Sequence, residues 1–191
     1  MKKFKLNNNL KYFVILSVLC FSLVAVFRPI VQNNLESIAV SAQPSKKNLP
    51  IYCVNTDEKK VAISFDAAWG ADDTDELLTI LKNNDVKATF FLCGYWVDKY
   101  PEEVKRIYEA GHEIGNHSNT HPHGSKISLE QNKNEIMEVH KKVKDLLDYD
   151  MDLYRPPFGE YNDTVLQAAK EVGYHTIQWD IEILDIKIEV L

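Results

Sequence analysis

The segment VAISFD, residues 61–66, decides the fold, because a short apolar run that ends on an acid is typical of a buried strand leading into a polar loop. Two comparable segments follow it in the chain. HSNTH, residues 117–121, comes after the short run 112–116, and RPPFG, residues 155–159, comes after the apolar pair 153–154. Each polar motif therefore follows an expected strand.

Strand-like and helix-like segments alternate between these motifs. Strands are expected at 61–65, 87–92, 112–116, 153–154 and 174–179, and helices at 73–83, 102–110, 128–147 and 162–172. Ser128, with Gln131 three residues later, indicates a helix start, while Gly111 and Gly173 indicate helix ends. The alternation predicts an α/β domain with a parallel sheet, either open or closed into a barrel.

Four polar residues fall at or just beyond the C-terminal ends of expected strands: Asp66, His117, Arg155 and Asp180. Ligands bind at this end in α/β barrels and in open α/β sheets. His117 and His121 are four residues apart, so a turn brings both rings to one side, and neutral imidazole is a common metal ligand. Although an isolated H-x-x-x-H is more often a pair of exposed loop histidines, this context predicts metal-assisted hydrolysis.

Composition narrows the classes of function. The chain has 191 residues, 45% of them hydrophobic, which suits one globular domain plus a leader. Its net charge of −6 argues against a nucleic-acid partner, since a phosphate-binding surface needs a basic excess.

The first residues differ from the rest. Residues 1–11 are basic and are expected in the cytoplasm, 12–31 are expected to form a signal anchor or transmembrane helix, and 32–55 form a linker to a domain at 56–191. A cleavage-like site at 40–42 lies far beyond the apolar run, so an uncleaved anchor is favoured over a cleaved signal peptide. Either alternative places the domain on the extracytoplasmic side, membrane-bound or secreted.

The remaining cysteines and histidines are expected to be structural. Cys53 and Cys93 have no recognisable spacing, so unpaired buried thiols are favoured over a disulfide. His112, His140 and His175 have no partners in sequence.

The motifs SFD (64–66), GNHSNTH (115–121) and RPPFG (155–159) together resemble those of the polysaccharide deacetylases with a NodB homology domain. The resemblance covers residues 60–187, and the variant FDAAWG (65–70) is most similar to the sporulation-associated branch. It implies a deformed (β/α) barrel that removes N-acetyl groups from N-acetylglucosamine polymers of the cell wall, such as peptidoglycan or chitin. The implied cofactor is a divalent metal, with zinc favoured and cobalt or manganese as alternatives.

The resemblance also implies catalytic roles. His117 and His121 would hold the metal, and Asp66 would take a proton from the water on that metal. Arg155 would orient Asp66 and keep it ionised, and Asp185 would support the arginine.

Two further residues face the expected substrate. The backbone N–H of Phe158 would donate to the oxyanion, and Trp69 would offer an apolar wall for a sugar ring, although core packing is the commoner use of tryptophan.

Departures from the family pattern leave two functions open. Ala67 stands where the family has an aspartate as the third metal ligand, so Asp72 or Asp73 would have to replace it. Ile186 and Glu182 also differ from the family, and its last motif, with a histidine as general acid, is absent. The chain is therefore expected to be incomplete at the C-terminal end of the barrel, and the alternative to a deacetylase is an inactive remnant that at most binds glycan.

Overall fold

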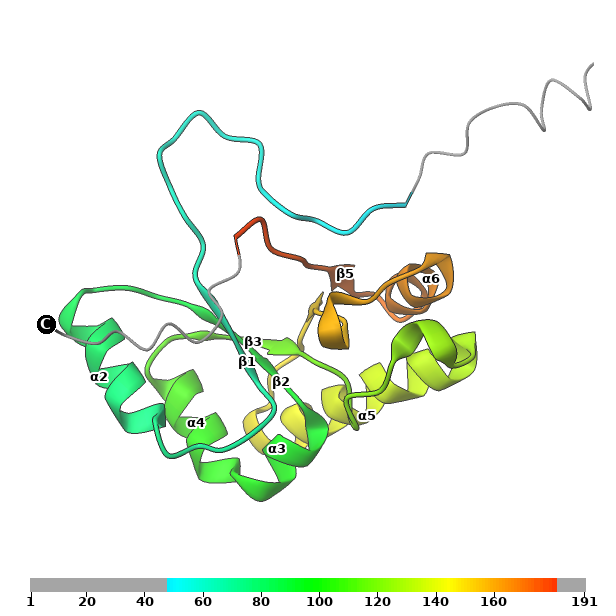
Figure 1. Ribbon diagram of the computed structural model, residues 1–191. Coiled ribbons are helices and arrows are strands. Elements are labelled where there is room, and N and C mark those ends of the chain that lie inside the picture. Colours follow the sequence, from blue (N-terminus) through cyan, green and yellow to red (C-terminus); the bar gives the residue numbers. More distant parts are fainter. Residues whose placement is uncertain (1–47, 182–191) are drawn as a thin grey trace, which may run out of the picture. The chain divides into compact units, whose positions relative to one another are not determined.

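A computed structural model describes residues 48–181 (Figure 1). The predicted anchor at 12–31 and the predicted supporting acid Asp185 lie outside the described residues. Within the described range, no helix has both the length and the apolar character needed to cross a membrane. The compact unit that contains the motifs begins at Asn48.

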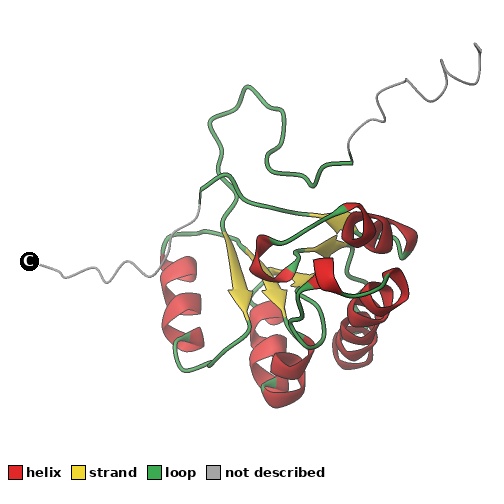
Figure 2. Ribbon diagram, turned by 45° about the vertical axis from the view of Figure 1, so that its right-hand side comes forward, coloured by secondary structure: helices red, strands yellow, loops and turns green. Residues whose placement is uncertain are grey.

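Five parallel strands form the sheet and lie side by side in chain order. They are β1 (Ser64–Ala67), β2 (Thr89–Leu92), β3 (Glu113–Asn116), β4 (Leu153–Tyr154) and β5 (His175–Thr176). Because the strand order never reverses and parallel crossovers are right-handed, the connecting helices gather on one face of the sheet, as in a (β/α) barrel. Figure 2 shows them in an arc around the strands. The prediction of a parallel α/β fold is confirmed.

The helices fall mostly where they were expected. They are α2 (Thr74–Asn83), α3 (Gly94–Lys99), α4 (Pro101–Glu109), α5 (Leu129–Leu147) and α6 (Asp163–Glu171), with short 3-10 turns at Gly124–Lys126 and Pro157–Gly159. Ser128 and Gln131 form the expected reciprocal cap at the start of α5. Helix α3 was not predicted, because six residues carry too little periodicity to be recognised.

The first strand begins later than expected. Residues 61–65 were predicted to be a buried strand, but β1 starts at Ser64 and Val61 is 89% exposed. Strand β1 lies at the edge of the sheet, and its last contact toward the N-terminus is Thr89 N donating to Ile63 O. Residues before Ile63 therefore have no ladder partner. Asp66 lies within β1 rather than after it.

Strand β2, which lies between β1 and β3, is buried on both of its faces, as an interior strand of a parallel sheet usually is. Phe90 and Leu92 belong to the core shared with the helices, whereas Phe91, equally buried, points to the opposite face. The helical contribution to that core comes from Leu81, Trp96, Val97, Val104, Ile107, Ile136, Val139, Val143, Val165 and Ala169.

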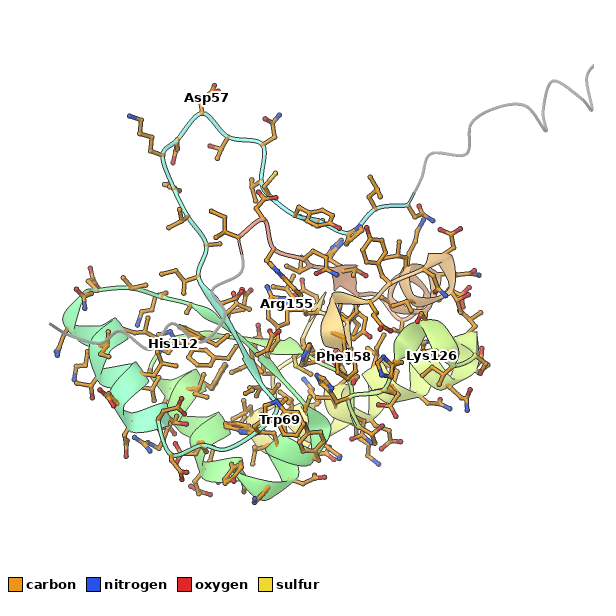
Figure 3. The ribbon with its side chains drawn as sticks, viewed as in Figure 1. Asp57, Trp69, His112, Lys126, Arg155 and Phe158 are labelled. Carbon is orange, nitrogen blue, oxygen red and sulfur yellow. The ribbon has the colours of Figure 1, made fainter. Side chains whose placement is uncertain are left out.

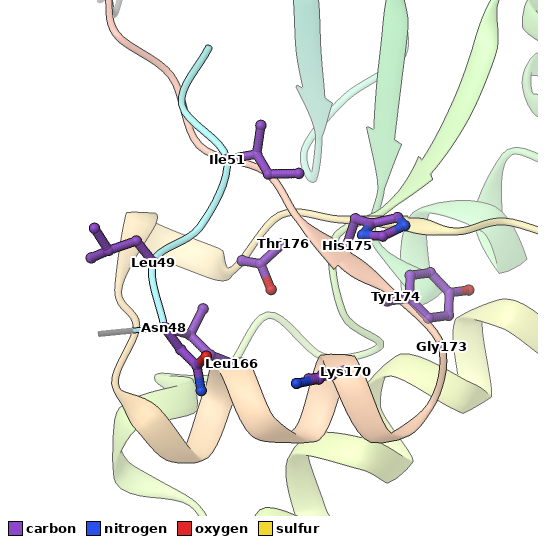
Figure 4. A pocket seen from close by; sticks show the side chains of 9 residues that line it. All are labelled: Asn48, Leu49, Ile51, Leu166, Lys170, Gly173, Tyr174, His175 and Thr176. Atoms are coloured by element: carbon purple, nitrogen blue, oxygen red, sulfur yellow. The ribbon is translucent and has the colours of Figure 1, made fainter. Parts of the chain in front are cut away.

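The end of the expected linker packs on the domain. Ile51 N donates to Thr176 O and Gln178 N donates to Ile51 O, both at 2.8 Å, so this segment extends the sheet beyond β5. A hollow lies between the segment, α6 and β5, with Leu49, Leu166 and Tyr174 among its lining residues (Figure 4). None of the predicted site residues lines this hollow.

Candidate active site

The register of the sheet brings three motif positions onto one face. Asp66 in β1 lies beside Phe91 in β2, and Phe91 lies beside Gly115 in β3. Side chains at paired positions of adjacent strands point to the same face of a sheet. This face is opposite the helices, and His117, two residues after Gly115, follows the same alternation.

Gly115 makes room for the Phe91 ring. A Cβ atom at position 115 would lie 2.5 Å from Cδ1 of Phe91, well inside van der Waals contact. The ring in turn supports Arg155, whose guanidinium carbon lies 4.1 Å from the Phe91 centroid. The Phe91 ring therefore packs against the guanidinium of Arg155.

Arg155 is buried and joins two residues of β1. Its Nη1 donates to Oδ1 of Asp66 and its Nη2 donates to Oγ of Ser64, both at 2.7 Å. The guanidinium carbon also lies 5.4 Å from the ring centroid of Trp179. A planar guanidinium beside two rings and two acceptors has one orientation only, so it fixes the Asp66 carboxylate.

His117 is 3% exposed and its ring is oriented by the backbone. Its Nδ1 lies 2.7 Å from the carbonyl oxygen of Arg155, which is an acceptor, so Nδ1 carries the proton. Nε2 then has a free lone pair and lies 3.7 Å from Oδ2 of Asp66. Burial lowers the pKa of His117, which keeps the ring neutral and able to bind a metal.

The loop that carries His121 adopts an unusual backbone. Both Ser118 (φ 65°) and His121 (φ 56°) are in the left-handed region that non-glycine residues rarely adopt. Ser118 Oγ accepts from the backbone N of His121 at 3.1 Å, and Thr120 donates through its backbone N and its hydroxyl to the Glu135 carboxylate at 2.7 and 2.9 Å. These bonds hold the second imidazole against the first, with ring centroids 5.0 Å apart.

Burial also lowers the pKa of His121. Its ring therefore stays neutral at neutral pH, as a metal ligand must.

Two exposed aromatic residues, Trp69 and Phe158 (labelled in Figure 3), lie next to the His121 imidazole. Trp69 is 78% exposed and Phe158 is 56% exposed, with their ring centroids 6.2 and 4.5 Å from that of His121. Phe158 has a left-handed backbone (φ 59°), and its N–H donates no hydrogen bond among the described residues. That N–H is therefore free to bind a substrate oxygen.

The structure brings some of the predicted residues together and leaves others apart. Asp66, His117, His121 and Arg155 converge, and Trp69 and Phe158 border them. Asp180 is exposed, as are Asp72 and Asp73.

Cys93, which was not predicted to be a metal ligand, lies close to the two histidines. The Cys93 Sγ and one ring nitrogen of each histidine all lie within 4.8 Å of one another. Among residues 48–181, Asp72 and Asp73 belong to no such group. Cys93 and Cys53 are both free thiols, as predicted, but only Cys93 is buried, whereas Cys53 is exposed because it lies in the segment before β1 that has no ladder partner. Burial raises the pKa of Cys93 to about 12. Cys93 directly follows the strand expected at 87–92. The same signal, a position just after an expected strand, had identified the other site residues and could have identified Cys93.

These donors fit a divalent cation. Two neutral imidazoles with an oriented lone pair, a nearby carboxylate and a thiol are the groups that bind zinc and related metals. The His117 ring also has the backbone partner at Nδ1 that metal-binding histidines usually have.

Comparison with known proteins establishes the family. The profile of the polysaccharide deacetylase family matches residues 54–177, so the chain belongs to this family. It is 37% identical over 128 residues to a peptidoglycan-N-acetylglucosamine deacetylase of Bacillus cereus, covering 67% of this chain and 46% of that protein. It is 36% identical over 138 residues to the peptidoglycan-N-acetylmuramic acid deacetylase PdaA of Bacillus subtilis, covering 72% of this chain and 52% of that protein.

One similar solved structure is of a relative that is named a pseudoenzyme. A pseudoenzyme of carbohydrate esterase family 4 from Bacillus anthracis is 34% identical, with a TM-score of 0.66 over 69% of this chain and 47% of that one. The chain spans about half the length of the curated relatives it matches. The family thus contains relatives named as deacetylases and one named as a pseudoenzyme.

Proposed function

We propose that this chain is a metal-dependent hydrolase that removes N-acetyl groups from N-acetylglucosamine-type residues of cell-wall polysaccharide. The observation that carries the proposal is the convergence of the Arg155–Asp66 ion pair with His117 and His121 on one face of the sheet. Two relatives named for peptidoglycan deacetylation support the substrate class.

Asp66 is the general base of the proposed reaction. One of its oxygens is held by Arg155 at 2.7 Å, while the other lies 3.7 Å from His117 Nε2, where a metal would bind. In hydrolysis the water oxygen forms a bond to the amide carbon, the water proton passes to Asp66, and the C–N bond breaks to give acetate and an amine that takes up a proton.

His117 and His121 hold the divalent cation, with zinc favoured. When bound, the cation supplies Lewis acidity, which lowers the pKa of water and polarises a carbonyl. The N–H of Phe158 binds the carbonyl oxygen as negative charge develops on it. Trp69 and Phe158, both exposed, give apolar surface for the sugar ring.

The proposed location follows from the sequence. The uncharged run at 12–27, which follows a basic start, supports a single-pass signal anchor at 12–31 in the cell membrane, with the domain on the extracytoplasmic side, where the polysaccharide lies.

A glycan-binding protein without turnover is the second candidate. It is favoured by the similarity to a pseudoenzyme and by Ala67, which offers no metal donor directly after Asp66. In this function, the exposed rings of Trp69 and Phe158 bind sugar. The converging polar residues Asp66, His117, His121 and Arg155 then only stabilise the fold.

The deciding experiment measures acetate release from N-acetylglucosamine oligomers and from peptidoglycan by the purified full chain with added zinc, cobalt or manganese. The proposal expects release that stops with a chelator, returns with metal, and is lost in Asp66→Asn. Asp57→Asn, the same change at an exposed loop acid, is the matched control (Figure 3). Oligomer binding without acetate release, unchanged in Asp66→Asn, identifies the glycan-binding protein instead.

A further inference from the structure

We propose that the thiolate of Cys93 is the third protein ligand of the metal, beside His117 and His121, an inference that rests on the metal site of the proposed function. Three lines of structure support it: the place of Cys93 in the sheet, the distances between the donor atoms, and the charge balance of the site.

Cys93 follows β2 directly, and its Sγ lies close to both imidazoles. Its backbone N donates to the carbonyl oxygen of Ala67 at 3.1 Å, so the two residues are neighbours across adjacent strands. Its Sγ lies 3.3 Å from the carbonyl oxygen of His117, and the residue is fully buried. The sheet therefore fixes the thiol next to Ala67, the residue after Asp66 that has no donor atom.

The donor atoms are close enough to share an ion. Sγ of Cys93 and one ring nitrogen each of His117 and His121 lie within 4.8 Å of one another. In a tetrahedral zinc site, bonds of about 2.3 Å to sulfur and about 2.0–2.1 Å to nitrogen place neighbouring donors roughly 3.3–3.6 Å apart. The donor atoms, at most 4.8 Å apart, therefore have to approach one another by no more than roughly 1.5 Å to share the ion.

The charge balance favours a thiolate. Asp66 has one oxygen committed to Arg155, and two neutral imidazoles leave the whole charge of a divalent ion uncompensated. Binding breaks the S–H bond, releases the proton to solvent and forms a sulfur–metal bond, which replaces the weak contact from Sγ to the carbonyl oxygen of His117. A single buried negative charge then compensates half of the ion's charge, and its desolvation is offset by direct contact with the ion.

The donor set also predicts which metal is preferred and what the site does. One sulfur and two nitrogens favour zinc over magnesium or calcium, which bind oxygen. Three protein ligands leave one position open, as in catalytic zinc sites. This position is the one that the proposed hydrolysis needs, so the cysteine completes the site without replacing Asp66 as the base.

The test is a cobalt titration followed by absorption spectroscopy. The protein is the full chain with Cys20→Ser and Cys53→Ser, so that Cys93 is its only thiol. We expect an intense sulfur-to-cobalt charge-transfer band in the near ultraviolet together with tetrahedral cobalt bands in the visible. Cys93→Ala should lose the near-ultraviolet band and bind cobalt at least tenfold more weakly, whereas the exposed Cys53 thiol, restored alone, should leave both unchanged.

A second measurement does not depend on how well the Cys93 variant folds. X-ray absorption at the zinc edge of the parent protein should show one sulfur neighbour at about 2.3 Å. Zinc with only nitrogen and oxygen neighbours overturns the assignment of Cys93 while leaving the histidine site and the proposed hydrolase standing. If neither zinc nor cobalt binds, the metal-dependent function fails together with it.

A competing carboxylate is tested in the same way. If Asp72→Ala with Asp73→Ala abolishes cobalt binding and the parent protein shows no sulfur band, the third ligand is one of these acids and the Cys93 assignment is wrong.

Discussion

Arg155 joins Asp66 and Ser64 through the two nitrogens at the end of one guanidinium, with both hydrogen bonds at 2.7 Å. Ser64 and Asp66 lie two residues apart on β1, so the two hydrogen bonds from Arg155 fix the orientation of the Asp66 carboxylate relative to its own strand. Lysine has one nitrogen and no planar fork, and cannot reproduce both bonds. Arg155→Lys should therefore lower acetate release by roughly tenfold to a hundredfold, the usual worth of a charge-assisted hydrogen bond.

Ser64→Ala is the matched partner of this change. It removes one neutral acceptor and leaves the ion pair intact, so its effect on kcat should be within about tenfold, and its metal affinity should equal that of the wild type. Equal activity of Arg155→Lys and the wild type would show that the ion pair does not position the base.

A glycine at the start of α3 allows the histidine loop to approach. Gly94 N donates to the carbonyl oxygen of Ser118 at 3.0 Å, and a Cβ atom at position 94 would lie 2.9 Å from Cα of Asn119. Backbone atoms cannot move aside cheaply. Gly94→Ala should therefore lower the free energy of unfolding by about 1–3 kcal/mol, the usual cost of overpacking, and should weaken metal binding.

Gly70→Ala is the control for this prediction. Its Cβ atom would meet nothing closer than Oδ2 of Asp72 at 3.8 Å, an ordinary contact. Urea unfolding should give a change within about 0.5 kcal/mol for Gly70→Ala. If both variants are equally stable, the close approach of the loop to Gly94 is not a constraint.

How much of this site the sequence predicts depends on what each residue does. Asp66, His117 and Arg155 are recognisable because parallel strands place their C-terminal ends together, so position along the chain implies position in space. Helix α5 was recognised by its cap, since Ser128 and Gln131 interact only with each other and with local backbone. Local signals of this kind need no knowledge of tertiary structure.

The features that were not predicted from the sequence depend on tertiary contacts. Cys93 was expected to be an unpaired buried thiol, and only the pairing of β2 with β3 brings it beside the histidines. The late start of β1 has the same origin, because an apolar residue such as Val61 forms no strand where the neighbouring strand offers no partner. Phe91 and Gly115 fit together across two strands, which no local pattern reveals.

The loop between the two histidines is held by an acid on α5. The Glu135 carboxylate accepts from both the backbone N and the hydroxyl of Thr120. Glu135→Ala removes both bonds, and because His121 is the next residue, metal affinity should fall by roughly tenfold, the worth of one to two such hydrogen bonds. Calorimetric zinc titration measures the change.

Two further variants separate the hydrogen bonds from the charge. Gln at position 135 can accept from the Thr120 N–H and donate to its hydroxyl, so Glu135→Gln should bind zinc nearly as tightly as the wild type. Glu138→Ala removes an exposed acid from the same helix and should have no effect. If Glu135→Gln loses as much affinity as Glu135→Ala, the carboxylate acts through its charge and not through positioning.

Acid should destabilise the domain through His112. The ring is buried against Phe90, with centroids 5.3 Å apart, and its Nδ1 accepts from the backbone N of Ala88 at 3.2 Å. Nδ1 accepts only when it carries no proton, and burial, assisted by the positive charge of Lys87, lowers the pKa of His112 below its ordinary value of 6.5.

Because the folded-state pKa of His112 is the lower one, the unfolded chain binds more protons as the pH falls below about 6.5. The free energy of unfolding should therefore decrease from that pH down to the folded-state pKa, below which His112 adds no further slope. His112→Gln, which keeps a polar side chain that cannot titrate, should make urea unfolding less dependent on pH across this window, whereas His175→Gln, at an exposed site on β5, should leave the slope unchanged. An identical slope in wild type and His112→Gln would mean that other groups cause the acid sensitivity.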